Sequence, residues 1–300
     1  TSINRNSSTL SLVDDCVQEF NYTINNLRNS EGLSGIPTGF SDIDNLLGGF
    51  QKSEMIVIAA RPSVGKTAFM LNVIENMLFN KNLNNPTILF FSLEMSKQAI
   101  IQRMACSISD VNAHKIRTKY LSKEESIRLK EAANKLKNKS FFIDDNSGLT
   151  TMELRSKSRR IKSEHGLDLV IIDYLQLLSL AHSGRRIDNR VLEVSEISKS
   201  LKNLAKELEV PVVAISQLSR RSVNAGSGKP ILSDLRDSGT IEQDADVVVL
   251  LSKDNTDSEN ASDHHVVNFD VAKQRNGPIG MVELIFFPQT TRFESMAKNL

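Results

Sequence analysis

The 300-residue chain is poor in residue types that build several common kinds of site. It contains no Trp, three Tyr and two Cys, and Cys16 and Cys106 lie far apart with no CxxC pair or Cys/His cluster around them. The sequence therefore gives no sign of a zinc site or a disulfide scaffold, and it fits a reducing compartment.

Long apolar runs and an excess of one charge are also missing. No run approaches the roughly 18 apolar residues that a membrane span needs, and the start, TSINRNSSTL, lacks the apolar core of a signal peptide. The 37 basic and 36 acidic residues give a formal net charge of +1, so a polyanionic partner would have to be bound by a local patch. We expect a soluble, cytoplasmic, globular protein. The start at Thr1 instead of Met is compatible with a piece of a longer chain.

The composition changes near residue 34. Between Leu10 and Leu27, apolar residues recur at alternating spacings of three and four, which predicts an amphipathic helix over about residues 10–28. The following stretch, NSEGLSGIPTG, is typical of a connector. The apolar stripe of this helix either packs on its own domain or docks on a neighbouring subunit. We interpret residues 1–34 as a linker segment and residues 35–300 as one domain.

Short apolar runs alternate with amphipathic segments along this domain. The runs predict strands, buried on both faces, over residues 55–60, 87–92, 140–144, 167–173, 211–216 and 246–251. The segments between them predict helices over residues 66–80, 97–106, 122–137, 151–165 and 191–208. This rhythm indicates an α/β fold with a mainly parallel central sheet flanked by helices. Residues 266–272 and 281–287 predict a terminal β-hairpin.

The string ARPSVGKT lies between the first predicted strand and the next helix. It departs from the phosphate-loop pattern G-x-x-x-x-G-K-[ST] only at its first position, which is Ala60. Such a loop needs inward N–H groups, a Lys for the β- and γ-phosphate oxygens, a hydroxyl for Mg²⁺ and a helix N-terminus. The residues in those places predict a site for ATP or another nucleoside triphosphate with Mg²⁺; they are Ser63, Val64, Gly65, Lys66, Thr67 and Ala68.

Polar residues follow three other predicted strands, at the edge where open α/β sheets bind ligands. Asp173 closes an apolar strand, where an ionised side chain is costly unless it meets a cation, and we expect it to be the second Mg²⁺ ligand with Thr67. Glu94 is the candidate general base, although an ordinary acidic residue in the first turn of the next helix would explain it equally well. Gln217 is a candidate sensor of the γ-phosphate.

Seven strings occur in an order that closely resembles the C-terminal motor domain of bacterial replicative DNA helicases of the DnaB type. They are GIPTGFSDIDNLLGGF, AARPSVGKTAF, FFSLEMS, LVIIDYLQLL, AISQLSR, DLRDSGTIEQDADVV and KQRNGPIG. The resemblance runs from about Gly35 to the end of the chain and implies a RecA-like P-loop NTPase fold. It also implies that Ala60 is a variant known in the family and that the N-terminal helix is an interdomain linker that docks on the neighbouring subunit.

The resemblance assigns roles to residues that spacing alone leaves open. Lys66, Thr67, Glu94, Asp173 and Gln217 keep the roles given above. Arg103, nine residues beyond Glu94, corresponds to an arginine near the phosphates of its own chain. Lys273 and Arg275 correspond to residues that reach the γ-phosphate of the adjacent subunit. The implied protein is a homo-hexameric ring that hydrolyses ATP at subunit interfaces, translocates 5′ to 3′ along single-stranded DNA and unwinds the duplex, with primase and a helicase loader as partners.

Two segments are candidates for contact with single-stranded DNA. Arg220 and Arg221 lie in a Gly/Ser-rich stretch with no acidic residue, which a solvated loop explains almost as well. The resemblance implies that Arg236, Asp237 and Gly239 hold DNA phosphates. The family more often has Glu at the position of Asp237. With so few aromatic residues, we expect backbone contacts that ignore the base sequence.

Two further basic runs are weaker candidates. The cations within residues 155–162 favour a solvated helix face, and the run SGRRIDNR, residues 183–190, is a second candidate pore loop.

Alternative functions stay open at this point. One is another RecA-like ATPase, such as a recombinase or a clock-type protein, which the strings RNGPIG and DLRDSG disfavour. Another is a ring assembly that is switched by nucleotide and does not unwind DNA. A phosphotransferase is a third, although the sequence shows no acceptor pocket.

Overall fold

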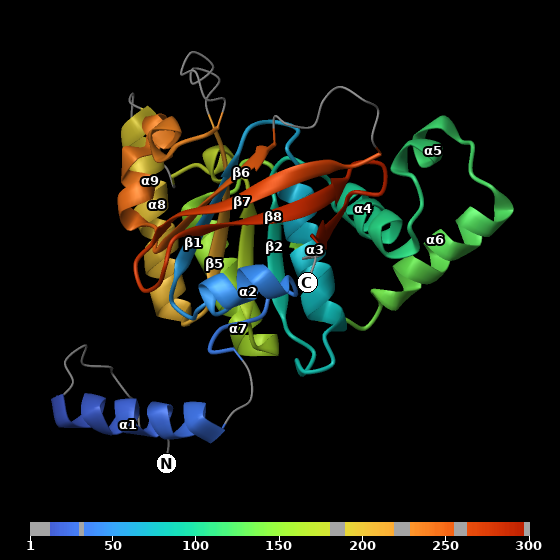
Figure 1. Ribbon diagram of the computed structural model, residues 1–300. Coiled ribbons are helices and arrows are strands. Elements are labelled where there is room, and N and C mark those ends of the chain that lie inside the picture. The colour runs from blue at the N-terminus through green and yellow to red at the C-terminus, as the bar shows by residue number, and fades with distance from the viewer. Residues whose placement is uncertain (1–12, 30–32, 181–189, 219–228, 255–262, 297–300) are drawn as a thin grey trace. The chain divides into compact units, whose positions relative to one another are not determined.

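The computed structural model describes residues 13–29, 33–180, 190–218, 229–254 and 263–296 (Figure 1). Internal contacts divide the chain into two units, Thr1–Ser34 and Gly35–Leu300. The first unit contains helix α1 (Val13–Asn29), whose first turn carries Asp14 and Asp15, where acidic side chains complement the helix dipole. The second unit contains the sheet and the helices that pack on it.

A nine-stranded sheet, counted over the described residues, runs in the order β3-β2-β4-β5-β1-β6-β7-β8-β9. The first six strands in this order are parallel, and the last three are antiparallel. This confirms the predicted α/β fold with a mainly parallel sheet. The strands are β1 (Met55–Ala60), β2 (Ile88–Ser92), β3 (Phe141–Asp144), β4 (Leu169–Asp173), β5 (Val212–Gln217), β6 (Val247–Lys253), β7 (His265–Gln274), β8 (Gly280–Phe287) and β9 (Arg292–Ser295).

Helices cover both faces of the sheet (Figure 1). One core joins the sheet to α2 (Ser41–Leu47), α3 (Lys66–Phe79) and α4 (Lys97–Ser109). A second core, on the opposite face, joins it to α7 (Thr151–His165), α8 (Arg190–Leu208) and α9 (Gly239–Asp244). The helices α5 (Ala113–Thr118) and α6 (Lys123–Lys135) extend outward from α4. Short 3₁₀ helices η1 (Leu175–Leu177) and η3 (Leu232–Ser238) follow β4 and precede α9.

The structure corrects two expectations about the sheet. β3 is half-buried along its whole length, although we predicted burial on both faces, because it is an edge strand with a neighbour on one side only. The β7–β8 hairpin is confirmed, but it is not terminal, since β9 pairs with β8. The sequence also did not predict α2, α5, α9 and β9, which are too short for hydrophobic periodicity to show.

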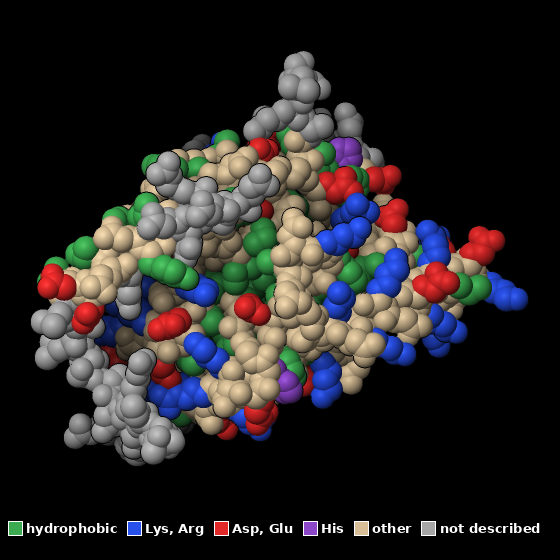
Figure 2. Space-filling view, turned by 90° about the horizontal axis from the view of Figure 1, so that it is seen from below, with side chains coloured by type: hydrophobic (Ala, Val, Ile, Leu, Met, Phe, Trp, Pro, Cys, Tyr) green, Lys and Arg blue, Asp and Glu red, His purple; other side chains and the backbone are tan. Residues whose placement is uncertain are grey.

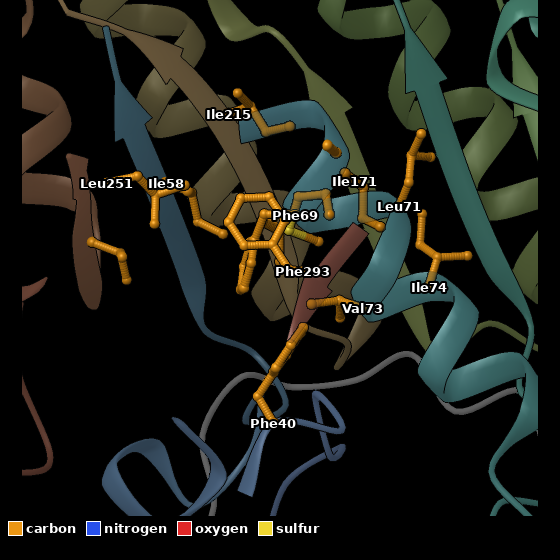
Figure 3. Packing of buried hydrophobic residues seen from close by; sticks show 14 of the residues in the cluster. Phe40, Ile58, Phe69, Leu71, Val73, Ile74, Ile171, Ile215, Leu251 and Phe293 are labelled. Carbon is orange, nitrogen blue, oxygen red and sulfur yellow. The ribbon is translucent and has the colours of Figure 1, made fainter. Parts of the chain in front are cut away.

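An aromatic cluster fixes α3 against the C-terminal strands (Figure 3). Phe69 is fully buried, its ring stacks on Phe40 with a centroid distance of 5.5 Å, and it meets Phe293 edge-on at 5.7 Å. Its third neighbour is Phe269 on β7, at 5.4 Å. The start of the helix that follows the phosphate loop is therefore held by residues from both ends of the domain.

We expect Phe69→Ala to lower the free energy of unfolding by about 3–5 kcal/mol, because it removes a fully buried ring and leaves a cavity. The matched control is Phe79→Ala on the same helix, where the side chain is 37% exposed; this change is expected to cost about 1 kcal/mol or less. Urea unfolding of both variants measures the difference. Equal losses would mean that the cluster does not anchor α3.

Candidate nucleotide and magnesium site

The phosphate loop connects the carboxyl end of β1 to the N-terminus of α3. Ser63 and Gly65 both have left-handed backbone conformations, with φ values of 66° and 106°. A Cβ on Gly65 would come within 3.0 Å of the Phe293 ring, so this position needs glycine for its conformation and for space. Ala60, where the motif has Gly, is fully buried as the last residue of β1. The methyl group that breaks the motif thus lies in the core.

Asp173 lies beside this loop at the carboxyl end of β4. Its side chain is 1% exposed, and its Oδ2 accepts a hydrogen bond of 2.6 Å from the Thr67 hydroxyl. The other oxygen, Oδ1, is buried and has no hydrogen-bond partner among the described residues. The Lys66 ammonium lies 5.2 Å from the centre of the Tyr174 ring. Residues 106 positions apart in the chain therefore form one oxygen-rich site next to the candidate phosphate lysine.

Burial dominates the electrostatics of Asp173 and raises the pKa of its carboxyl above the ordinary value. The hydrogen bond from Thr67 and the charge of Lys66 oppose this rise in pKa, Glu94 adds to it and Arg103 opposes it. Because the charges of Lys66, Glu94 and Arg103 all act on the Asp173 carboxyl, these three side chains lie near it. Four of the predicted site residues, together with Thr67, are thus brought to one edge of the sheet.

The residues at this site fit a hard divalent cation. The unpaired Oδ1 of Asp173 and the Thr67 hydroxyl are oxygen donors of the kind that Mg²⁺ prefers. No group of three or more His, Cys, Asp or Glu that could enclose a metal occurs in the part of the chain that the structure describes. A cation here would complete its coordination with water and with phosphate oxygens, as Mg²⁺ does when it binds together with a nucleotide.

Glu94 is exposed and follows β2, whose last residue, Ser92, is in register with Asp173 on β4. The helix α4 starts at Lys97 after the N-cap Ser96, whose hydroxyl accepts from the Ala99 N–H, and its first turn holds no acidic residue. Glu94 therefore lies before the helix, and the alternative explanation as a first-turn residue does not hold.

The side chain of Gln176, which the sequence analysis did not single out, connects the ends of β4 and β5. Its amide donates to the Ser216 hydroxyl at 2.8 Å and to the Gln217 carbonyl at 3.3 Å, and its oxygen accepts from the Gln217 N–H at 3.3 Å. Gln217 itself is in register with Ala60, next to the phosphate loop. Gln176 thus fixes the main chain of the candidate sensor. Its position within LVIIDYLQLL was the only signal available.

Lys273 and Arg275 lie at the opposite edge of the sheet. β7 is antiparallel to β6, so Lys273 faces Val248, and the Arg275 N–H donates to the carbonyl of Asp246, just before β6 begins. The Asp246 N–H in turn donates to the carbonyl of Met55, the first residue of β1. In Figure 1 the β7–β8 turn accordingly lies at the other end of the sheet from the loop between β1 and α3. These two cations cannot reach the phosphate loop of their own chain.

The candidate DNA contacts are described only in part. Arg236 and Asp237 belong to η3 and Gly239 begins α9, whereas Arg220 and Arg221 lie outside the described residues. Of residues 183–190, only Arg190 is described, and it pairs with Glu193.

The basic run on α7 is largely paired within its own domain. Arg155 and Arg159 contact Glu207, and Lys157 contacts Asp144. Basic and acidic side chains are also interspersed over the face seen in Figure 2. The solvated-face interpretation of this run is therefore favoured. No described helix is both long and apolar enough to cross a bilayer.

Comparison with known proteins decides the family. Residues 35–295 match the model of the DnaB-like helicase C-terminal domain. The chain belongs to this family. It is 44% identical over 287 residues to the replicative DNA helicase DnaB of Geobacillus stearothermophilus, with 95% of this chain and 62% of the relative covered. It is 41% identical over 296 residues to the replicative DNA helicase DnaC of Bacillus subtilis, with 98% and 64% covered. The chain thus spans less than two thirds of the length of these curated relatives.

Two solved structures share the fold. An ATPase domain superposes with a TM-score of 0.86 at 34% identity, covering 96% of this chain and 100% of that chain. The second is the structure of a DnaB-like replicative helicase, whose description includes its interactions with primase. It superposes with a TM-score of 0.82 at 34% identity, and the match covers 97% of this chain and 68% of that chain. The RecA-like fold and the family resemblance predicted from the seven strings are confirmed.

We expect Asp173→Asn to raise the melting temperature of the nucleotide-free protein in EDTA at pH 7. The raised pKa means that ionising Asp173 costs free energy in the folded state, and Asn keeps the Thr67 hydrogen bond without the charge. The cost is complete above the folded-state pKa and vanishes as the pH falls below the ordinary value, so the gain should shrink in acid. Thermal scans at several pH values measure it.

The control is Asp145→Asn, because the backbone hydrogen bond from Lys97 lowers the pKa of Asp145. This variant should lose stability at pH 7, and its deficit should shrink as the pH falls through the lowered pKa. A loss of stability in Asp173→Asn as well would show that the buried carboxylate is already compensated.

Gly65→Ala should abolish nucleotide binding, since both the φ of 106° and the Phe293 ring oppose a Cβ. Removing the ring with Phe293→Leu in the same chain relieves part of the steric conflict, although Phe286 would still lie 3.2 Å from the Cβ, and it leaves the strained φ, so we expect no recovery. Titration with a fluorescent ATP analogue reports binding. Recovery in the double variant would show that space alone requires this glycine.

Proposed function

We propose that this chain is the motor part of a replicative DNA helicase, in which ATP hydrolysis at the subunit interfaces of a ring drives translocation along single-stranded DNA and duplex unwinding. Membership of the DnaB-like family supports the class of protein. The observation that carries the proposal is the separation of the phosphate loop from Lys273 and Arg275, which lie at opposite edges of one sheet. A complete site then requires two chains.

In this proposal the nucleotide phosphates lie on the loop and helix start formed by residues 63–68. Lys66 contacts the β- and γ-phosphates, and Thr67 and Asp173 hold Mg²⁺, which neutralises phosphate charge when it is bound. Glu94 accepts a proton from the attacking water, and Gln217, held by Gln176, responds to the γ-phosphate. Arg103, whose charge lowers the pKa of Asp173, stabilises the phosphates in its own chain.

The second half of the site comes from the adjacent subunit. Met55 and Ala60 mark the two ends of β1, roughly 16 Å apart at the rise of a β-strand. Arg275 lies at the Met55 end, because its N–H bonds the carbonyl of Asp246 and the Asp246 N–H bonds the carbonyl of Met55. The phosphate loop follows Ala60, at the other end. A head-to-tail ring brings the Arg275 edge of one chain to the loop of the next, which is the heterologous contact that closed rings use. We propose a homo-hexamer.

The helix α1 supplies a second contact in this ring. Its apolar side chains Val13, Val17, Phe20 and Ile24 are between 41% and 75% exposed. An apolar groove of about 610 Å³ lies between α4, α5 and α6, and its lining includes Ile101, Ile116, Leu121, Leu129 and Phe141. We propose that the α1 stripe of one subunit occupies this groove on its neighbour, where both apolar surfaces leave water.

Single-stranded DNA passes the ring in contact with the segments that hold Arg220 and Arg221 and with Arg236, Asp237 and Gly239. The affinity from such phosphate contacts depends strongly on salt concentration, and the contacts do not discriminate between base sequences. Primase is proposed as a partner because the solved DnaB-like helicase was studied with its interactions with primase. A helicase loader is proposed from the family resemblance.

Arg275→Ala should reduce the turnover of ATP by about 10³ to 10⁵, the range seen when other NTPases lose an arginine supplied in trans. Arg160→Ala is the control, since Arg160 is exposed on α7 and outside the proposed site. The assay is ATP hydrolysis per chain over a range of protein concentrations, with and without single-stranded DNA. A rate that depends on neither concentration nor DNA would rule out shared sites. Nucleotide binding without any hydrolysis would favour the nucleotide-switched assembly.

Phe20→Asp should weaken ring assembly, because it places a charge in the apolar stripe of α1. Tyr22→Asp is the control, since Tyr22 is 71% exposed and lies off the stripe on the same helix. Sedimentation velocity at several concentrations measures both variants. If the two change assembly equally, the stripe does not form the contact.

A further inference from the structure

Asp246, just before β6, is a buried carboxylate that the proposed function does not yet use. Its side chain is 7% exposed, at the sheet edge that carries Lys273 and Arg275. Its Oδ2 accepts from the Met55 N–H at 2.7 Å and from the Lys202 ammonium at 2.5 Å. Its Oδ1 lies 3.4 Å from the guanidinium of Arg275. The carboxylate therefore joins β1, α8 and Arg275, one of the two cations that are proposed to reach the adjacent subunit.

The two cations on Asp246 are bound unequally. The Lys202 side chain is 14% exposed and its contact is short, whereas the Arg275 side chain is 45% exposed and its contact is long. An exposed ion pair of that length contributes little, while removing one partner of a buried pair is costly. Arg275 is thus the partner that can leave, and Lys202 with the Met55 N–H keeps Asp246 in place and neutralised when it does.

The last turn of α9 holds Arg275 from the other side, together with Lys273. The Lys273 ammonium donates to the carbonyls of Glu242, Gln243 and Ala245, and the Arg275 guanidinium donates to the carbonyl of Gln243. Carbonyls at a helix C-terminus carry partial negative charge and favour cations. Burial, followed by the charge of Arg275, lowers the pKa of Lys273, so these acceptors hold together two cations that repel each other.

We propose that Asp246 is a positioning residue that, together with the α9 carbonyls, presents Arg275 and Lys273 to the γ-phosphate of the adjacent subunit. This inference rests on the proposed function. In the described structure the Arg275 guanidinium has a long contact to Asp246 and a bond to the neutral Gln243 carbonyl, and a phosphate can replace both with charge-assisted, bidentate hydrogen bonds while Asp246 stays fixed.

The first measurement is steady-state ATP hydrolysis by Asp246→Asn in the assembled ring. We expect kcat to fall by about tenfold to a hundredfold, as when a catalytic group is misplaced by about 1 Å, and less than in Arg275→Ala. The KM for ATP should change by less than about twofold, because the phosphate loop of each chain is intact. An unchanged kcat would overturn the proposal.

A mixing experiment separates positioning in trans from damage within one chain. Asp246→Asn chains keep Lys66, and Lys66→Ala chains keep Asp246 and Arg275. In rings that assemble at random from equal amounts of the two variants, about a quarter of the sites combine an intact phosphate loop with intact cations from the neighbouring chain. We expect single-turnover hydrolysis with about that amplitude, although each variant alone hydrolyses ATP slowly.

The reference for this experiment is the mixture of Arg275→Ala with Lys66→Ala. Recovery in the reference mixture alone would overturn the role of Asp246, because its effect would then stay within its own chain. Recovery in neither mixture would instead overturn the shared site of the proposed function, and the role of Asp246 with it.

If Asp246→Asn does not fold, Lys202→Met asks the same question. It removes the ammonium that, with the Met55 N–H, keeps Asp246 in place, so Arg275 is no longer presented in a fixed position, and kcat should fall with recovery in the Lys66→Ala mixture. Lys199→Met is the matched control on α8, since Lys199 is 54% exposed and contacts only Glu196 in the described structure. Equal effects of the two methionine substitutions would contradict the proposal.

Discussion

The hydrogen bond between the Thr67 hydroxyl and the buried Asp173 carboxylate joins the helix α3, which follows the phosphate loop, to the end of strand β4, and the candidate site depends on this contact. Burial disfavours the ionised form of this carboxylate, which is 1% exposed, and raises its pKa. Its second oxygen is buried without a partner in the described residues, which leaves it to a cation. The burial of Asp173 thus costs stability, and it places carboxylate and hydroxyl oxygens next to Lys66, where we propose that Mg²⁺ binds with the nucleotide.

Rigid packing makes that arrangement possible. Phe69, one turn after Lys66, is buried between rings from the chain before β1 and from β7 and β9. The Phe293 ring also closes the space beside Gly65. The late antiparallel strands therefore pack against the phosphate loop, and the end of β7 and the turn after it place Lys273 and Arg275 at the far edge of the same sheet. In the proposed function, one extension of the sheet thus serves both halves of a site that two subunits share.

The two edges solve different electrostatic problems. At the phosphate-loop edge, the buried Asp173 carboxylate has one oxygen without a hydrogen-bond partner among the described residues, and this oxygen can bind a cation. At the opposite edge, two cations are held close together by Asp246 and by the carbonyls that end α9, and the buried Lys202 keeps Asp246 neutralised. Cations held by weak acceptors can be transferred to a phosphate without rearranging the fold around them. In the proposed function both edges bind a nucleotide: a cation completes the Asp173 site at one edge, and the cations at the other edge exchange their acceptors for a phosphate held by the adjacent subunit.

Sequence alone determined the local features of this protein. Apolar runs predicted the strands, because strands that are buried on both faces consist almost entirely of apolar residues. The string ARPSVGKT predicted the phosphate loop with Lys66 and Thr67, because phosphate binding needs residues that are adjacent in the chain. Seven ordered strings identified the family, which the comparisons confirmed. Short elements such as α2, α5, α9 and β9 escaped because they span too few residues for a period to appear.

Contacts between distant residues were decided only by the tertiary structure. Nothing in the sequence placed Gln176 on Gln217, or Asp246 between Lys202 and Arg275, because such contacts depend on strand order and register. The antiparallel direction of β7 also decided that Lys273 and Arg275 face away from Lys66. Residue types and spacing thus fixed which chemistry the chain can perform, and the order and direction of the strands decided which groups meet within one chain.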